Sequence, residues 1–254
     1  MIGWLQSLDV SLFRFINSSL SNRVFDQWMP FMSDSPWLAC ILISICVWLL
    51  FRGGARGRIC VLMLVLALVL GNWLVVDSFK NAVGRLRPFV VLAGVHLRVG
   101  MGDSFSMPSS HAANWFSATL VLFVYYRRSI WAMLPLALLV CVSRVYNGVH
   151  YPSDVLAGAI FGAGYSVAVI FGFDGLWQTI GARWFPNWHA RLPSLLHPSF
   201  TGVESPDQTE WLRLGYVLIV FCFVLRLAYI GSGKIELSED EAYQWLWSKH
   251  PALS

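Results

Sequence analysis

Long apolar runs, separated by short polar segments, follow one another along most of this 254-residue chain. A helix of about 20 apolar residues is long enough to cross the hydrocarbon core of a bilayer. Several of the runs approach or reach that length. The pattern therefore predicts six membrane-spanning helices, at about residues 37–51, 59–79, 112–126, 130–142, 155–173 and 212–230.

Two other segments show different patterns. Residues 2–20 place apolar side chains such as Trp4 and Leu12 at helical spacing, with polar residues such as Asp9 between them. That alternation is typical of an amphipathic helix that lies in the membrane interface. Residues 175–210 contain several prolines and scattered charges, which predicts a linker between the fifth and sixth spans.

Composition decides the class of protein. Hydrophobic residues make up 57% of the chain and charged residues only 13%, which predicts an all-α integral membrane protein. The formal net charge is +4 without a run of five basic residues, so nucleic acid is not an expected partner. The five cysteines fall inside apolar runs without a CxxC pair, which favours packing over metal binding. No cleavable signal peptide is predicted at the N-terminus.

The arginines predict how the helices are oriented. Arg52, Arg56 and Arg58 follow the first span, and Arg127 with Arg128 follow the third. Arginine-rich loops are typically cytoplasmic, so both loops are predicted inside. The remaining polar clusters then fall together on the external side. These clusters are Lys80 with Arg87-Pro88, Pro108-Ser109-Ser110-His111, and Ser143-Arg144 with His150 and Asp154.

The three clusters combine groups that bind phosphate with groups that could react with it. Lys80, Arg87 and Arg144 are cations suited to phosphate oxygens. The turn of residues 108–111 before a helix adds backbone N–H groups at a positive helix end. A histidine can attack phosphorus while a second protonates the leaving oxygen, and a carboxylate four residues after His150 could orient its ring.

In this order and spacing, the three clusters resemble the signature of the type 2 phosphatidic acid phosphatase superfamily. The resemblance covers about residues 75–160. It implies a phosphatase core of five spans, with His150 as the nucleophile, Asp154 orienting it and His111 as the general acid. It also implies that Lys80, Arg87, Ser109, Ser110 and Arg144 hold the phosphate, without metal or cofactor. Ser110 stands where the family usually has glycine.

The implied substrate is a lipid phosphomonoester or diphosphate whose tail stays in the bilayer of a bacterial inner membrane. Undecaprenyl diphosphate is favoured, while phosphatidylglycerol phosphate, phosphatidate and lipid A 1-phosphate are left open. Lipid phosphotransfer and a non-catalytic lipid-phosphate binding module are the competing functions.

Asp77, Arg85 and Asp103 match no motif position and are interpreted as loop or structural groups. Asp174 and His189 are interpreted as solvated linker residues.

The C-terminal segment carries a second resemblance. Residues 236–248 are similar to the first external loop of glycosyltransferases that use polyprenyl-phosphate sugars, which makes Asp240 a candidate site residue of that loop. The predicted domains are therefore a lipid phosphatase domain at 1–174, a cytoplasmic linker at 175–210, and the start of a truncated glycosyltransferase-like domain at 211–254. The rest of the fused transferase would be missing, and no transferase activity is expected of this chain.

Overall fold

The structure is a computed structural model that describes residues 2–34, 36–198 and 208–231. These residues form helices and loops, without a β-strand among them, which confirms the predicted all-α fold. The helices and helical turns are α1 (Ile2–Arg14), η1 (Phe15–Ser19), α2 (Arg23–Asp34), α3 (Pro36–Arg52), α4 (Gly54–Leu70), η2 (Gly71–Val76), α5 (Asp77–Val83), α6 (Pro88–Val91), α7 (Ser110–Tyr125), η3 (Arg127–Ser129), α8 (Ile130–Tyr146), α9 (Pro152–Leu176), η4 (Trp177–Gly181), α10 (Ala182–Trp184), α11 (Pro186–Arg191) and α12 (Gln208–Gly231).

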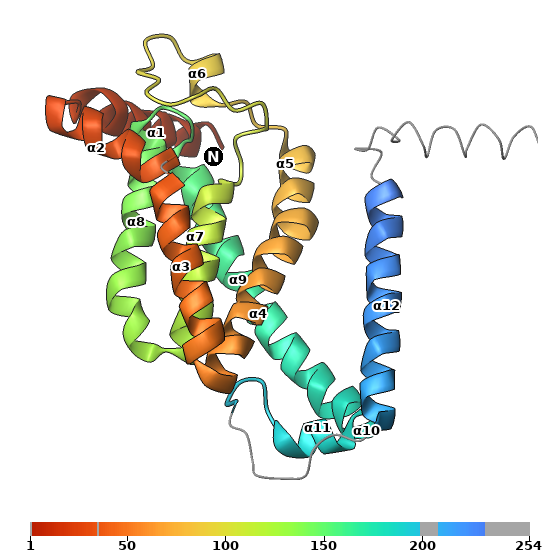
Figure 1. Cartoon of the computed structure of the whole chain (residues 1–254). Coiled ribbons are helices and arrows are strands. Elements are labelled where there is room, and N and C mark those ends of the chain that lie inside the picture. The colour runs from red at the N-terminus through yellow and green to blue at the C-terminus, as the bar shows by residue number, and fades with distance from the viewer. Residues whose placement is uncertain (1, 35, 199–207, 232–254) are drawn as a thin grey trace, which may run out of the picture.

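α3, α4, α7, α8 and α9 stand side by side as a bundle, while α12 stands apart from it (Figure 1). α1, α2 and α6 lie across its upper end, while α10 and α11 lie at its lower end. All six ranges predicted as spans are helical. By length and apolar composition, three segments of the described chain can cross a membrane, at 54–91, 127–146 and 152–184, and a fourth if the bent pair 23–33 and 38–52 is one span. The protein is thus a multi-pass membrane protein.

The centre of the bundle is the contact between α7 and α9. A Cβ on Gly158 would lie 2.4 Å from the Ser109 carbonyl oxygen, and one on Gly162 would touch the Ala113 carbonyl. These two glycines therefore let the backbones of α9 and α7 approach each other closely, as small residues do in membrane helices. This contact holds the polar turn at the start of α7 against the first turns of α9.

Two parts of the chain differ from their sequence patterns. α2, which contains Pro30, was not predicted, yet it packs on α8 with Met29 and Ser33 buried. The predicted linker 175–210 is partly helical, because α9 continues to Leu176 and is followed by η4, α10 and α11. A side chain interpreted as solvated, Asp174, instead accepts hydrogen bonds from Ser194 Oγ (3.2 Å) and Leu195 N (2.7 Å).

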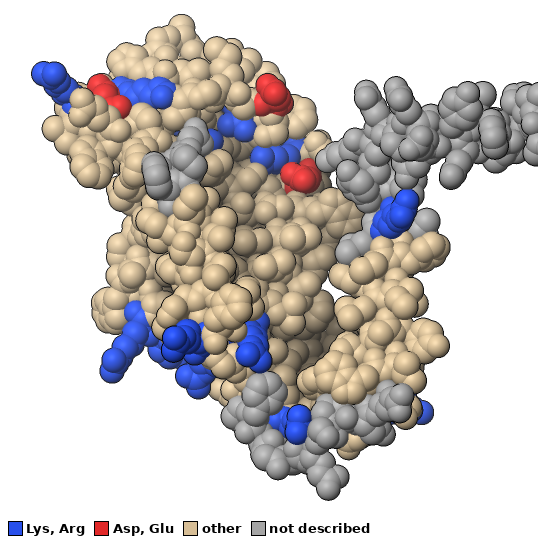
Figure 2. Space-filling model, viewed as in Figure 1, with Lys and Arg blue, Asp and Glu red and all other residues tan. Residues whose placement is uncertain are grey.

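Basic residues gather at the lower end of the bundle (Figure 2). Arg56, Arg127 and Arg128 line one cavity there, together with His197. The start of α7 and the loop around α6, which carry the predicted catalytic clusters, lie at the upper end (Figure 1). The arginine loops and the polar clusters therefore occupy opposite ends of the molecule, as the sequence predicted.

Candidate active site

The first cluster is shaped by the end of α5. Gly84 ends this helix in the left-handed conformation (φ 60°), and its N–H donates to the Lys80 carbonyl (2.9 Å). Glycine takes this conformation without the steric cost that other residues meet. The chain then runs extended through Arg87 to Pro88, the first residue of α6. This turn of the backbone places the side chains of Lys80 and Arg87 next to each other.

The two cations meet at one oxygen atom. Lys80 Nζ donates to Ser104 Oγ (3.2 Å) and Arg87 Nη2 donates to the same atom (3.0 Å). Each of the two side chains is only 7% exposed. Among the described residues, neither has a carboxylate within 4.0 Å. Buried cations are costly without an anion, so the place where they converge suits a phosphate oxygen.

His150 lies beside this cationic site and is 2% exposed. Its Nε2 is 3.5 Å from Arg87 Nη1, while its Nδ1 is 3.7 Å from Asp154 Oδ2. The same carboxylate oxygen accepts hydrogen bonds from Ser106 Oγ (2.5 Å) and from the N–H of Tyr151 (2.9 Å). One ring nitrogen therefore faces the carboxylate and the other faces the cations.

Burial lowers the pKa of His150 to about 4, and Arg144 and Arg87 act in the same direction, although Asp154 opposes them. The imidazole is consequently neutral at pH 7 and carries a lone pair on one nitrogen. A neutral ring with its Nδ1 toward a carboxylate holds the proton on that side. The lone pair of Nε2 then points to the cationic site, as a nucleophile requires.

The second cluster is fixed by its backbone. Ser109 is the N-cap of α7, and its N–H donates to the Asp154 carbonyl (2.9 Å). Its side chain is fully buried, and Ser109 Oγ has no hydrogen-bond partner in the described structure. An unpaired buried hydroxyl costs about 1–3 kcal/mol. A phosphate oxygen bound here would supply the missing acceptor. Ser110 is the first residue of α7 and is partly buried.

Comparisons with known proteins identify the family of this chain. The family description "PAP2 superfamily" matches residues 59–178. The bacitracin transport permease protein BcrC of Bacillus licheniformis is 30% identical over 158 residues, which cover 61% of this chain and 75% of that protein. The chain belongs to the PAP2 superfamily. The undecaprenyl-diphosphatase BcrC of Bacillus subtilis is 28% identical over 170 residues, covering 65% of the chain and 81% of that protein. The crystal structure of Aquifex aeolicus LpxE superposes on this PAP2 chain with a TM-score of 0.54 and 28% identity, covering 65% of this chain and 95% of that one.

Membership in the PAP2 superfamily, with phosphatases among its relatives, makes this chain a membrane lipid phosphatase. The predicted family, enzyme class and multi-pass membrane fold are thereby confirmed.

The predicted site residue Asp240 lies outside the described residues. Within the described residues, no three His, Cys, Asp or Glu side chains are grouped so that they could hold a metal ion.

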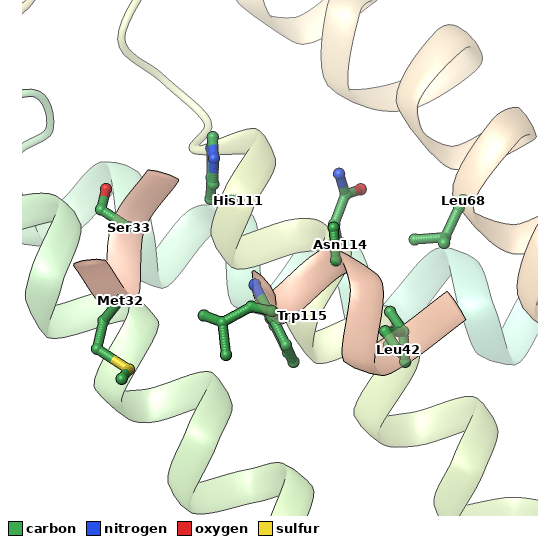
Figure 3. A pocket seen from close by; sticks show the side chains of 10 residues that line it. Met32, Ser33, Leu42, Leu68, His111, Asn114 and Trp115 are labelled. Atoms are coloured by element: carbon green, nitrogen blue, oxygen red, sulfur yellow. The ribbon is translucent and has the colours of Figure 1, made fainter. Parts of the chain in front are cut away.

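A mainly apolar cavity of about 420 Å³ opens beside the site of this PAP2 protein (Figure 3). His111, Asn114 and Trp115 of α7 line it from one side. Ser33 of α2 also lines it and accepts a hydrogen bond from Arg144 Nη1. The cavity is therefore lined both by His111 and by a residue that Arg144 contacts. Its other lining residues are Met32, Leu38, Ala39, Leu42, Leu68 and Ala118.

The structure also adds residues that sequence reasoning missed. Arg85 forms ion pairs with Asp154 (2.7 Å) and Asp9 (2.6 Å), and Ser104 and Ser106 contact the cations and the carboxylate. The charged side chains buried in the described structure are Asp9, Lys80, Arg87, Arg144 and Asp154, and all of them lie in this region around the neutral His150. Neither spacing nor hydropathy signals Arg85 or Asp9, since their partners lie about 70 residues away or further along the chain.

Proposed function

We propose that this PAP2 protein hydrolyses the terminal phosphate of a lipid diphosphate, with undecaprenyl diphosphate as the favoured substrate, through a phosphohistidine on His150. The observation that carries the proposal is the orientation of the His150 ring. Its Nδ1 faces Asp154 and its Nε2 faces Arg87, in a buried cationic site. A site that only bound phosphate would not need a neutral, oriented imidazole beside its cations.

In the first step, His150 Nε2 attacks the terminal phosphorus and the P–O bond to the lipid phosphate breaks. His111 gives its proton to the leaving oxygen. Lys80, Arg87 and Arg144 neutralise charge on the transferring phosphoryl group, together with the Ser109 hydroxyl and the N–H groups of residues 110 and 111. In the second step, water gives a proton to His111 and attacks phosphorus, while the bond between His150 Nε2 and phosphorus breaks. Its electron pair returns to Nε2, which releases inorganic phosphate and restores neutral His150.

The apolar cavity supports a lipid substrate. It lies next to His111, the residue that would protonate the leaving group, so a lipid phosphate leaving there would have an apolar space for the start of its chain. The similarity to the Bacillus subtilis undecaprenyl-diphosphatase supports the favoured lipid. Phosphatidylglycerol phosphate, phosphatidate and lipid A 1-phosphate are the competing substrates.

The experiment is phosphate release by the purified protein in detergent, with these lipids as a panel, with a chelator present and beside His150→Ala. We expect turnover that survives chelation, is highest on undecaprenyl diphosphate and vanishes in the variant. Turnover that persists in folded His150→Ala would refute the phosphohistidine. Transfer of the phosphate to a second lipid, without release, would indicate a phosphotransferase, and no turnover on any lipid would favour a binding module.

We further propose that the site faces the periplasm or exterior of a bacterial inner membrane. The support is the separation of the site from the arginine-rich end. A cysteine introduced at exposed Asp103 should react with a membrane-impermeant thiol reagent in intact spheroplasts. One introduced at exposed Arg128, at the opposite end, should react only after lysis. The reverse pattern would overturn this orientation.

The glycosyltransferase-like domain at 211–254 stays a hypothesis of its own. The family match ends at residue 178, and residues 232–254 lie outside the described part of the chain. If the hypothesis is correct, a longer form of the protein would transfer sugar from a polyprenyl-phosphate donor and would lose that activity in Asp240→Asn. The boundaries of the predicted domains likewise stay a prediction.

A further inference from the structure

We propose that Arg85, held in place by Asp9 of α1, is a positioning residue that sets the charge and orientation of Asp154, and through it the reactivity of His150. This inference rests on the proposed histidine mechanism. It assigns a role in that mechanism to the N-terminal interfacial helix, which carries none of the three motifs.

The Arg85 guanidinium bridges two carboxylates. Its Nη1 donates to Asp154 Oδ1 (2.7 Å) and to Ser153 Oγ (2.7 Å), while its Nη2 donates to Asp9 Oδ2 (2.6 Å). The guanidinium carbon also lies 4.0 Å from the centre of the Tyr151 ring. Contacts on several sides fix the guanidinium plane, which a flexible lysine ammonium could not reproduce.

Asp9 completes the arrangement from the opposite side. It is 8% exposed, and its Oδ1 accepts the N–H of Ser153 (2.9 Å) in the first turn of α9. Its Oδ2 accepts the Ser153 hydroxyl (2.6 Å) as well as the Arg85 Nη2. Asp9 therefore satisfies a backbone donor at the positive end of α9 and anchors Arg85 at the same time.

Asp154 depends on this support because its side chain is completely buried. Its Oδ2 faces His150 and Ser106, while Arg85 donates to the other carboxylate oxygen, Oδ1. A buried carboxylate that loses its cation would gain a proton or rotate. Either change would release the His150 ring from the tautomer that leaves Nε2 free to attack.

The backbone of Arg85 supports the same carboxylate by a second route. Its carbonyl accepts the N–H of Ser106 (2.8 Å), and the Ser106 hydroxyl donates to Asp154 Oδ2 (2.5 Å). This backbone contact survives substitution of the side chain. A variant at position 85 therefore removes the guanidinium while Ser106 stays held, which isolates the effect of the charge.

The chain offers a matched control in Arg98. Its Nε pairs with Asp26 (2.7 Å), and its guanidinium lies 4.3 Å from the centre of the Tyr146 ring. Arg98 thus has an ion pair and a stacked tyrosine like Arg85, but it contacts none of the motif residues. Loss of the Arg98 guanidinium should lower stability without changing the chemistry.

The experiment compares Arg85→Met, Arg85→Lys, Asp9→Asn and Arg98→Met in phosphate release and in thermal unfolding. We expect Arg85→Met to lower kcat by about 10- to 100-fold, the range typical of groups that orient a catalytic residue. KM should change little, because Arg85 does not contact the phosphate site. Arg85→Lys should have a kcat between those of the wild type and Arg85→Met. If Arg85→Met does not fold, Arg85→Lys takes its place in the comparison.

The pH profile separates positioning from simple loss of structure. The charged groups around His150 are Asp154 of α9, Arg144 of α8 and Arg87, with Arg85 and Asp9 behind Asp154. Without Arg85, protonation of the His150 and Asp154 pair becomes easier. The acid limb of kcat/KM should therefore move to higher pH in Arg85→Met and stay in place in Arg98→Met.

A double-mutant cycle tests whether Asp9 acts through Arg85. Asp9→Asn alone should lower kcat, but should lower it little further in the Arg85→Met background. The proposal is overturned if Arg85→Met matches Arg98→Met in kcat and pH profile, if its effect is confined to KM, or if the two effects are independent. A wild-type protein without phosphate release, or an active His150→Ala, would instead refute the proposed function itself.

Discussion

Replacing Gly158 by alanine tests whether the contact between α7 and α9 sets the geometry of the phosphate site. The new Cβ would lie 2.4 Å from the Ser109 carbonyl oxygen, a backbone atom that cannot rotate away. Ordinary van der Waals contact begins near 3.4 Å, so the two helices must separate by about 1 Å. Ser109 and the start of α7 would move with that displacement.

Overpacking of this kind costs about 1–3 kcal/mol, while the better helix propensity of alanine returns up to about 1 kcal/mol. The expected loss of stability is therefore small. The loss of activity is larger, because a displacement of about 1 Å in an active site can lower the rate by about 100-fold. Initial rates of phosphate release and thermal unfolding in detergent measure the two effects separately.

Gly164→Ala is the control in the same helix. A Cβ at that position meets nothing within 4 Å, so the variant should keep wild-type activity and gain slightly in stability. The reasoning is wrong if Gly158→Ala keeps wild-type kcat/KM. It is also wrong if both variants lose activity equally, since the cause would then be the glycine itself and not the contact with Ser109.

Four further predictions follow from three side chains. Because burial lowers the pKa of His150 to about 4, its imidazole should stay neutral down to about pH 5 in nitrogen-labelled NMR titrations, and an ordinary titration near pH 6.5 would contradict this. Since the folded state then binds fewer protons than the unfolded state between about pH 4 and 6.5, acidification through this range should favour unfolding. Ser109→Ala should leave the unfolding temperature unchanged or higher, because it removes an unpaired buried hydroxyl, yet should weaken inhibition by inorganic phosphate by about 10-fold or more; a stability loss without weaker inhibition would refute this. Asp174→Ala should lower stability by about 1–3 kcal/mol through lost hydrogen bonds to Ser194 and Leu195 while kcat stays constant, and a matching loss of kcat would show that the lower end of the bundle affects the site.

The sequence predicted the fold and the motif residues because both leave local signals. The six apolar runs predicted the helices that the structure shows as α3, α4, α7, α8, α9 and α12. The orientation of the spans predicted that Lys80, Arg87 and His150 would lie on the same side, and the family resemblance implied that they share one site. α2 was missed because it carries Pro30 and many polar residues, so its pattern resembles a loop more than a span.

The supporting residues left no such signal. Asp9 is one of several polar residues in an amphipathic pattern, where a solvent-exposed carboxylate is the usual expectation. Arg85 matches no position of the three motifs, so the sequence pattern favoured a loop or structural role for it. Their ion pairs join segments 76 and 69 residues apart in sequence. Only the folded chain shows that α1 and α9 meet at one guanidinium.

The balance of buried charge explains why these residues belong together. Asp9 neutralises Arg85, so the charge of Asp154 acts on His150 instead of being cancelled by its nearest cation. Lys80, Arg87 and Arg144 then remain as an excess of positive charge in a buried site. A terminal phosphate carries close to two negative charges at neutral pH. In the proposed mechanism, the ion pairs of Arg85 with Asp9 and Asp154 thus let one compact region hold both an anion that orients the nucleophile and cations that bind the substrate.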